Sequence, residues 1–318
     1  MKRRIIALSA AMLTLCGCSH KTEVRDKGFV RTIGCDDGML QSVAVRLYGD
    51  TNVLTGVGQT IFSAVENAET AQGKTLFTGH LELLVLSEGD IREKLSVLIK
   101  NNRISPSCSV IVTPDSATKA VTDYKEEELS GLLDSYDRKG RISRKNISDV
   151  LNDLLEDDNL AASPVLSEDR LTMGIISHTG VEAILSEDES NGFCWLTGSL
   201  HDFYLPVEVG GKTASFQVRN SKTRLTAAKQ GESIAVTTEI KINGSCIEEG
   251  VSETDAANAA AEKISSLCSK TISKTVTGMK ADVLGIKKTI VSANIDTEST
   301  WEEIIPRLRF YYSIKIAS

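Results

Sequence analysis

The chain has 318 residues, of which 36 are lysine or arginine and 43 are aspartate or glutamate, so its formal net charge is −7. This length is enough for two or three domains, because single cores stop growing at about 250 to 300 residues. An acidic surface repels nucleic acid and anionic lipid headgroups, and no basic run or aromatic stacking platform offsets it, so we expect no nucleic-acid partner.

The first 18 residues have the pattern of a lipoprotein signal peptide. A basic start at residues 2–4 precedes an apolar run at residues 5–15, and Gly17 precedes Cys18. The run is too short to span a bilayer, which needs about 20 helical residues. We predict cleavage between Gly17 and Cys18, and a diacylglyceryl and N-acyl anchor in the lipid bilayer at Cys18. The alternative is an ordinary cleaved signal with a coincidental cysteine.

Removing residues 1–17 takes three basic side chains, so the net charge changes from −7 to −10. The remaining cysteines form no CxxC pair and no zinc pattern, which favours isolated buried thiols over disulfides. These cysteines are Cys35, Cys108, Cys194, Cys246 and Cys268.

After a tether at residues 18–28, strands and helices alternate, which is typical of a mixed α/β layer. Asp37-Gly38 predicts a tight hairpin turn with a positive φ, and Ser87 and Asp90 have the spacing of a capping box. Gly56 and Gly58 form only a weak phosphate-loop pattern. The elements expected in chain order are a hairpin of strands 29–33 and 39–48, a helix at 59–71, a strand at 81–86, a helix after Asp90, and a strand at 108–112.

Several segments, in this order, resemble the Ger(x)C spore germination lipoproteins, the C subunits of nutrient-germinant receptors. The segments are 29–36, 73–80, 82–88, the strand after Pro106, 282–285 and 301–316. The chain departs from the family where Ser19-His20 replaces an aromatic-acidic pair and where Gly34-Cys35-Asp36 replaces Gly-Ile-Asp. The resemblance implies a position on the outer surface of the spore inner membrane and assembly with membrane-embedded A-type and B-type subunits.

Residues 113–163 have a polar, helical pattern, with helices expected at 125–133 and 146–155. The segment between them, 134–140, fails as a calcium loop because its ligand positions hold the wrong residues, so we interpret it as a solvated helix connection. A proline after an acidic run predicts a domain boundary at Ser163–Pro164.

The second half has the pattern of an antiparallel sheet packed by a long helix. A hairpin is expected at 171–176 and 181–185, and alternating strands at 234–242 and 308–316. The longest helix is expected at 254–278, with Ser252 and Asp255 at its start. The fold class is therefore α+β, with an N-terminal mixed-sheet domain at 29–163 and a C-terminal α+β region at 164–318. An alternative divides the latter near 225 into a small middle domain and a sheet-plus-long-helix domain.

The sequence contains no recognised catalytic motif, so we predict a non-enzymatic protein with no catalytic residue, cofactor or metal site. His80 is the most notable histidine because the resemblance centres on it, and we expect a structural role with a hydrogen bond near a strand start. The acidic pairs at 157–158 and 248–249 are expected to be solvated charge.

The leading hypothesis is a lipid-anchored subunit of a spore germinant receptor that acts in nutrient-triggered germination. A lipid-anchored solute-binding protein of a transporter is the second hypothesis. The absence of two similar lobes in the sequence pattern and the presence of only 15 aromatic residues argue against it. A secreted hydrolase is the third hypothesis, and the missing nucleophile constellation makes it the weakest.

Overall fold

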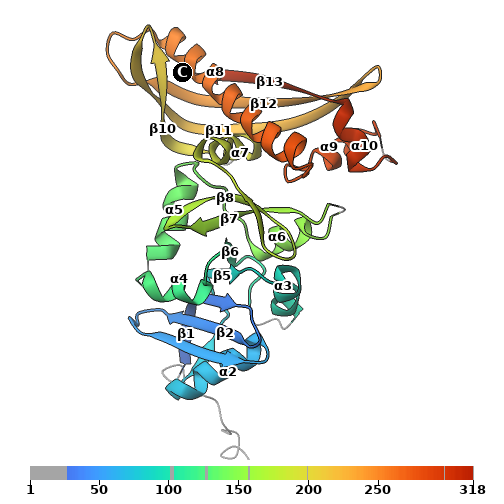
Figure 1. Cartoon of the computed structure of the whole chain (residues 1–318). Coiled ribbons are helices and arrows are strands. Elements are labelled where there is room, and N and C mark those ends of the chain that lie inside the picture. Colours follow the sequence, from blue (N-terminus) through green and yellow to red (C-terminus); the bar gives the residue numbers. More distant parts are fainter. Residues whose placement is uncertain are drawn as a thin grey trace, which may run out of the picture.

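The structure is a computed structural model that describes residues 27–100, 104–125, 128–156, 158–198, 200–296 and 298–317. Its described strands form two separate sheets, one in each half of the chain. The two halves follow one another along the long axis of the molecule in Figure 1, with the first sheet at one end and the second at the other. This arrangement confirms the α+β class.

The first sheet is mixed, with the strand order β3-β2-β1-β5-β6-β7-β8-β9, and β4 pairs with the start of β1. Its central strands β1, β5, β6 and β7 run parallel, and the outer strands are antiparallel. The strands are β1 (Lys27–Asp36), β2 (Gln41–Leu47), β3 (Val53–Gly58), β4 (Thr75–Phe77), β5 (Leu83–Ser87), β6 (Ser109–Thr113), β7 (Ala161–Ser167), β8 (Arg170–Ile176) and β9 (Val181–Ile184).

Helices cover both faces of this sheet, so its central strands are buried on both sides, as the apolar run at 81–86 predicts. One core contains side chains of α2, α3 and α6, and the opposite core contains those of α4 and α5. The helices are α2 (Ile61–Gln72), α3 (Ile91–Lys100), α4 (Ala117–Asp123), α5 (Glu128–Arg138) and α6 (Ile147–Asp153).

The glycines before α2 serve packing. Both lie in β3, a strand that the sequence pattern did not reveal, and a Cβ on Gly56 would lie 2.0 Å from the carbonyl oxygen of Ala64. The missing side chain lets α2 lie directly on the strand. Thr60, with Ser63, forms the capping box that starts the helix.

Three local predictions are wrong. Gly38 does not adopt the positive φ expected of a tight turn. Asp90 is the residue that accepts the hydrogen bond from Glu93 N at the start of α3, whereas Ser87 ends β5. The segment 134–140 is mostly helical, because α5 continues to Arg138.

The boundary predicted at Ser163–Pro164 is also misplaced relative to the sheets. Both residues lie inside β7, which pairs with β8 along its whole length, and β9 continues the same sheet. The second sheet begins only after α7 (Glu187–Thr197). Pro164 is tolerated because β7 pairs with β6 only at Val165, so few of its backbone groups face that neighbour.

The second sheet has the order β10-β11-β12-β13. Its strands are β10 (His201–Val209), β11 (Lys212–Gln230), β12 (Ser233–Cys246) and β13 (Leu308–Ala317). The first three strands are antiparallel, but the two strands predicted for an antiparallel sheet, β12 and β13, run parallel, because the chain between them crosses the sheet as a helix. The nineteen-residue strand β11 was not predicted, because half-buried positions replace a clear apolar alternation in its second half.

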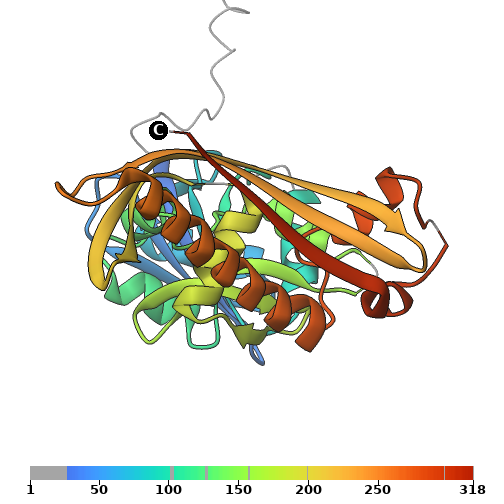
Figure 2. The same cartoon turned by 90° about the horizontal axis from the view of Figure 1, so that it is seen from above.

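The long helix α8 (Glu253–Ile272) packs across one face of the second sheet, as Figures 1 and 2 show. Ser252 accepts the hydrogen bond from Asp255 N that the sequence predicts. A π-helical turn at Ser273–Gly278 prolongs the helix, and two short helices follow, α9 (Ile286–Ser292) and α10 (Trp301–Ile304).

Helix α7 belongs to the packing of both halves. Phe193 lies in the core of the first sheet, whereas Trp195 lies in the core of the second. Gly192 allows close contact with α8, since a Cβ there would lie 2.2 Å from the carbonyl oxygen of Leu267. Helix α7 therefore connects the packing of the two sheets.

Candidate functional site

The predicted anchor lies outside the described residues. Gly17, Cys18 and the tether up to residue 26 precede the first described residue, Lys27. Cleavage and lipidation at Cys18 therefore remain predictions from the sequence.

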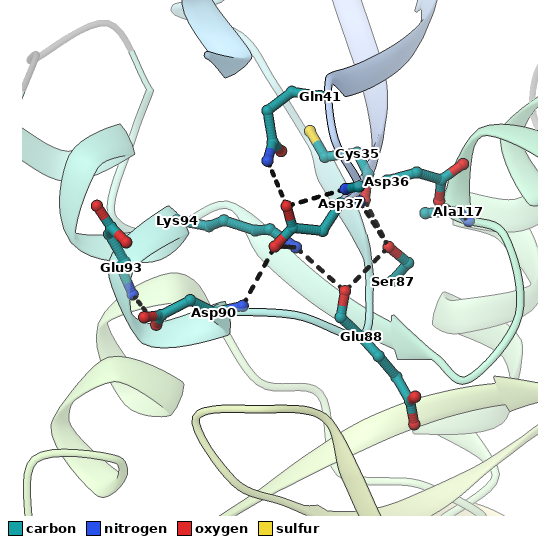
Figure 3. A network of polar contacts seen from close by, with 11 residues as sticks. Cys35, Asp36, Asp37, Gln41, Ser87, Glu88, Asp90, Glu93, Lys94 and Ala117 are labelled. Carbon is teal, nitrogen blue, oxygen red and sulfur yellow. Dashed lines mark hydrogen bonds and ion pairs between the residues drawn. The ribbon is translucent and has the colours of Figure 1, made fainter. Parts of the chain in front are cut away.

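The most connected polar site lies at the carboxyl ends of β1 and β5, where parallel α/β sheets commonly place functional groups. Figure 3 shows that the side chains of Asp37 and Lys94 meet there. The ammonium group of Lys94 lies 3.2 Å from the carboxylate of Asp37, and this lysine side chain is only 5% exposed. It also donates to the backbone oxygen of Glu88 at 3.3 Å.

The carboxylate of Asp37 is held by several donors. It accepts hydrogen bonds from the side chain of Gln41 and from the backbone N–H groups of Gly38 and Asp90. Burial acts to raise its pKa, but the hydrogen bond from Gln41 and the charge of Lys94 outweigh burial and lower the pKa overall. Asp37 is therefore ionised at neutral pH.

The loop after β5 connects this network to a third segment. Gly89 N donates to the backbone oxygen of Thr179 at 2.8 Å, and Ile91 N donates to that of His178 at 2.8 Å. Gly89 has a φ of 121° and its Cβ would collide with Asp37, so only glycine fits. The network therefore joins the β1–β2 hairpin, the start of α3 and the β8–β9 turn.

The preceding residue, Asp36, binds the start of α4 through hydrogen bonds. Its carboxylate accepts hydrogen bonds from Ser116 Oγ and Ala117 N, both at 2.6 Å. Gly34 makes room for the same helix, because a Cβ there would lie 2.5 Å from the carbonyl oxygen of Ala117. The segment 34–36, which carries part of the family resemblance, thus has a direct structural explanation.

The polar groups around Asp37 and Lys94 hold three chain segments together, and we call this site the clamp. Its charged groups are opposite in sign and hydrogen-bonded to one another or to backbone, which leaves no group poised as an activated nucleophile. Sequence reasoning missed Lys94, although its place among the inward-facing residues Ile91, Leu95 and Leu98 of α3 was a usable signal.

A cavity of about 450 Å³ with a mixed polar and apolar lining lies between α2, α3 and the first sheet. Ile33 and Leu84 line it from the sheet, and Val65 lines it from α2. Glu66 and Glu69 contribute carboxylates, and Glu69 also accepts a hydrogen bond from Leu76 N at 2.7 Å. The cavity has the size of a small-ligand pocket, and its two acidic groups disfavour an anionic ligand.

His80 has a structural environment, but a different one from that predicted. Its side chain is exposed, and its ring packs against Phe77 and Phe29 with centroid separations of 5.6 and 6.2 Å. The hydrogen bond near it involves the backbone, because Tyr48 Oη donates to His80 O at 3.1 Å. This aromatic group stabilises the start of β1.

The five cysteines of the described part are free thiols. Four of them are buried, as predicted, and Cys246 is half-buried. Burial raises the pKa of Cys35 and of Cys108 to about 12, so these thiols remain protonated.

The acidic pairs are less solvated than the sequence suggests. Asp158 accepts a hydrogen bond from Asp282 N at 2.7 Å, and Glu248 accepts one from Ser215 N at 2.7 Å. Asp282 in turn accepts from Ile286 N at the start of α9, and burial raises its pKa to about 7. The resemblance segment 282–285 therefore forms a joint between the two halves of the chain.

Within the described residues, no group of three or more metal-ligating side chains comes together. The helices of the same residues include none that is long and apolar enough to cross a bilayer.

Comparison with known proteins assigns both halves of the chain. The family described as "Spore germination protein N-terminal domain" matches residues 20–168, and the family described as "Spore germination B3/ GerAC like, C-terminal" matches residues 173–317. No curated protein matches.

Among solved structures, the crystal structure of the GerBC protein is similar with a TM-score of 0.61 and 14% sequence identity. The match covers 90% of this chain and 97% of that chain, and at this identity it shows a shared fold. Since the two family matches follow one another along nearly the whole chain, this protein belongs to the Ger(x)C family of spore germination proteins.

Proposed function

We propose that this protein is the lipid-anchored, non-enzymatic C subunit of a spore germinant receptor, and that it acts with membrane-embedded A-type and B-type subunits on the outer face of the spore inner membrane. The observation that carries the proposal is the pair of family matches, which together span residues 20–317. The signal-peptide pattern ending at Cys18 supports the anchor.

The architecture supports a binding and relay role over catalysis. The best-connected polar site is a clamp between Asp37 and Lys94 that fixes three chain segments. Helix α7 contributes side chains to the cores of both halves and so connects their packing. Such a connection suits a subunit that transmits the state of its partners.

The anchor is tested by labelling cells that express the protein with a radioactive or clickable fatty acid. The wild-type chain should incorporate the label, and the Cys18→Ala variant should not, because the acyl groups attach to that thiol and to the new N-terminus. Cys246→Ala is the matched control, since it removes a partly exposed cysteine elsewhere and should label like wild type. Equal labelling of Cys18→Ala refutes the anchor.

The receptor role is tested by deleting the gene in its spore-forming host and measuring nutrient-triggered germination. We expect slower or absent germination on at least one nutrient, restored by the wild-type gene but not by Cys18→Ala. Normal germination on every nutrient, in a host whose other germinant receptors have also been deleted, refutes the role.

The solute-binding alternative receives little support from the fold. The two sheets differ in strand number, order and direction, whereas a two-lobed binding protein is built from similar α/β lobes around a cleft. A permease and an ATPase encoded beside this gene, in place of germinant-receptor membrane subunits, would favour the alternative.

A further inference from the structure

The open face of the second sheet carries an unusual concentration of positive charge. Helix α8 covers the opposite face, where Ile234, Val236 and Ile240 are buried. On the open face, the paired positions of β11, β12 and β13 carry five exposed basic side chains and one half-buried carboxylate, Glu239, and the neighbouring strand β10 adds the carboxylate of Glu208. The basic side chains are Lys222, Arg224, Lys241, Arg309 and Lys315.

Three of the lysines form one row across the sheet. Lys222 is directly opposite Lys241 in the antiparallel pair, and Lys241 is directly opposite Lys315 in the parallel pair. Neighbouring strands lie about 4.8 Å apart, so the stems of three like charges are adjacent. Like charges directly opposite one another destabilise a sheet, so this row costs stability.

Glu239 only partly neutralises the row. Its carboxylate lies 2.6 Å from the ammonium of Lys315 and 3.9 Å from that of Lys241. Both lysine side chains remain 63% exposed, so their charges face solvent. The net charge of this face is positive, whereas the whole chain is acidic. Charge that is segregated in this way points to an anionic partner.

We propose that the open face of β11–β13 binds the anionic phosphate headgroups of the membrane that holds the Cys18 anchor. This inference rests on the proposed function, because the anchor is what brings the chain to a bilayer. Residues 18–26 separate Cys18 from β1, and nine extended residues span roughly 30 Å. This reach keeps the start of β1 near the bilayer, and anionic lipids attract the basic side chains of any face that approaches the surface.

The proposal gives the molecule an orientation. β1 starts at the end of the molecule that lies away from the second sheet, as Figure 1 shows. With the anchor near one end and the basic face at the other, the long axis lies along the bilayer. The anchor then supplies stable attachment, and the lysine row fixes which side faces the lipid.

The test measures binding of the chain from residue 18 onward, with Cys18→Ala, to sedimented lipid vesicles. We expect binding to vesicles with about 30% phosphatidylglycerol and none to pure phosphatidylcholine, with salt weakening the binding. The variant Lys222→Gln/Lys241→Gln/Lys315→Gln should bind about a hundredfold more weakly, since each lysine near the surface contributes about fivefold.

A matched variant distinguishes the effect of where the lysines lie from the effect of the net charge of the chain. Lys119→Gln/Lys274→Gln/Lys288→Gln removes the same charge from exposed helix or turn positions outside this face and should bind like the parent. Glu239→Gln removes the carboxylate that lies beside the lysine row and should strengthen binding about fivefold. These opposite signs cannot arise from misfolding.

Two results overturn the proposal: a parent chain that does not bind anionic vesicles, or triple variants that weaken binding equally. If the parent chain does not bind anionic vesicles, an acidic protein surface becomes the candidate partner of this face. Neither result affects the anchor or the germination role, because the vesicle assay uses a chain without the anchor.

Discussion

The buried ion pair between Asp37 and Lys94 allows the clamp to be tested quantitatively. Replacing Asp37 by Asn keeps the shape of the side chain but leaves the ammonium of Lys94, which is 5% exposed, without its counter-charge. Replacing Lys94 by Met removes that charge together with the need to neutralise it. The two single variants and the double variant form a thermodynamic cycle.

Breaking a fully buried pair from one side costs about 3 to 5 kcal/mol in the free energy of unfolding. Asp37 is 27% exposed, so water compensates partly and we expect a loss of about 2 to 3 kcal/mol for Asp37→Asn. Lys94→Met should cost only about 1 kcal/mol, because Asp37 keeps its hydrogen bonds from Gln41 and the backbone. The double variant should resemble Lys94→Met, which gives a coupling energy of about 2 kcal/mol.

The measurement needs a probe located in the first half of the chain. Both tryptophans, Trp195 and Trp301, pack in the core of the second sheet, so their fluorescence does not report the clamp directly. Hydrogen exchange followed by mass spectrometry can compare peptides covering 83–100 with peptides covering 233–246. Asp37→Asn should accelerate exchange in the first set and leave the second nearly unchanged.

The pH dependence gives a second check on the same pair. The pKa of Asp37 is lowered from 3.8 in the folded chain, so its stabilising effect is complete above that value and is lost as the pH falls below it. Asp37→Asn should flatten this part of the stability profile. Additive single variants, or exchange that is unchanged in 83–100, would refute the argument that the clamp holds these segments.

Three further predictions concern other parts of the chain. Gly34→Ala should lower the unfolding free energy by about 2 kcal/mol, because its Cβ would lie 2.5 Å from Ala117 O. The measurement is a urea titration followed by circular dichroism. Gly131→Ala, where a Cβ meets nothing within 4 Å, is the control. Burial raises the pKa of Asp282 to about 7, so its contribution to stability is lost as the pH rises through 7, and Asp282→Asn should remove this loss in melting curves from pH 5 to 8. A thiol reagent added to the folded chain with Cys18→Ala should modify Cys246 quickly and the four buried thiols only after unfolding; rapid modification of several thiols would contradict their burial.

The predictions that succeeded depend on side-chain periodicity. The strand at 81–86, the helix at 254–278 and the strands at 234–242 and 308–316 each have a clear apolar pattern, and each is present with its ends shifted by a few residues. The parallel direction of β13 could not be predicted in the same way. Apolar alternation is identical for parallel and antiparallel strands, and the direction is fixed by the helical crossover.

The site was harder to predict than the fold, because its residues come together only through topology. Asp37 and Lys94 are separated by one helix and four strands in the sequence, and a lysine in a helix is ordinarily solvated. The sequence pattern indicates only a turn at Asp37, since sequence alone does not show that parallel strands bring α3 and α4 to the same end of the sheet.

The charge on the second sheet shows why composition alone does not decide whether the chain can bind an anionic surface. A net charge of −7 predicts repulsion from anionic lipid, and this would hold if the charges were evenly spread. In the folded chain, period-two alternation in β11–β13 directs Lys222, Lys241 and Lys315 to one face while the apolar residues between them turn to α8. Interactions fall off within a Debye length of about 10 Å in 0.1 M salt, so a surface responds to the face it meets and not to the distant acidic residues. Under the proposed binding mode, the orientation of the chain at a bilayer would depend on three residues that are far apart in sequence and adjacent in the sheet.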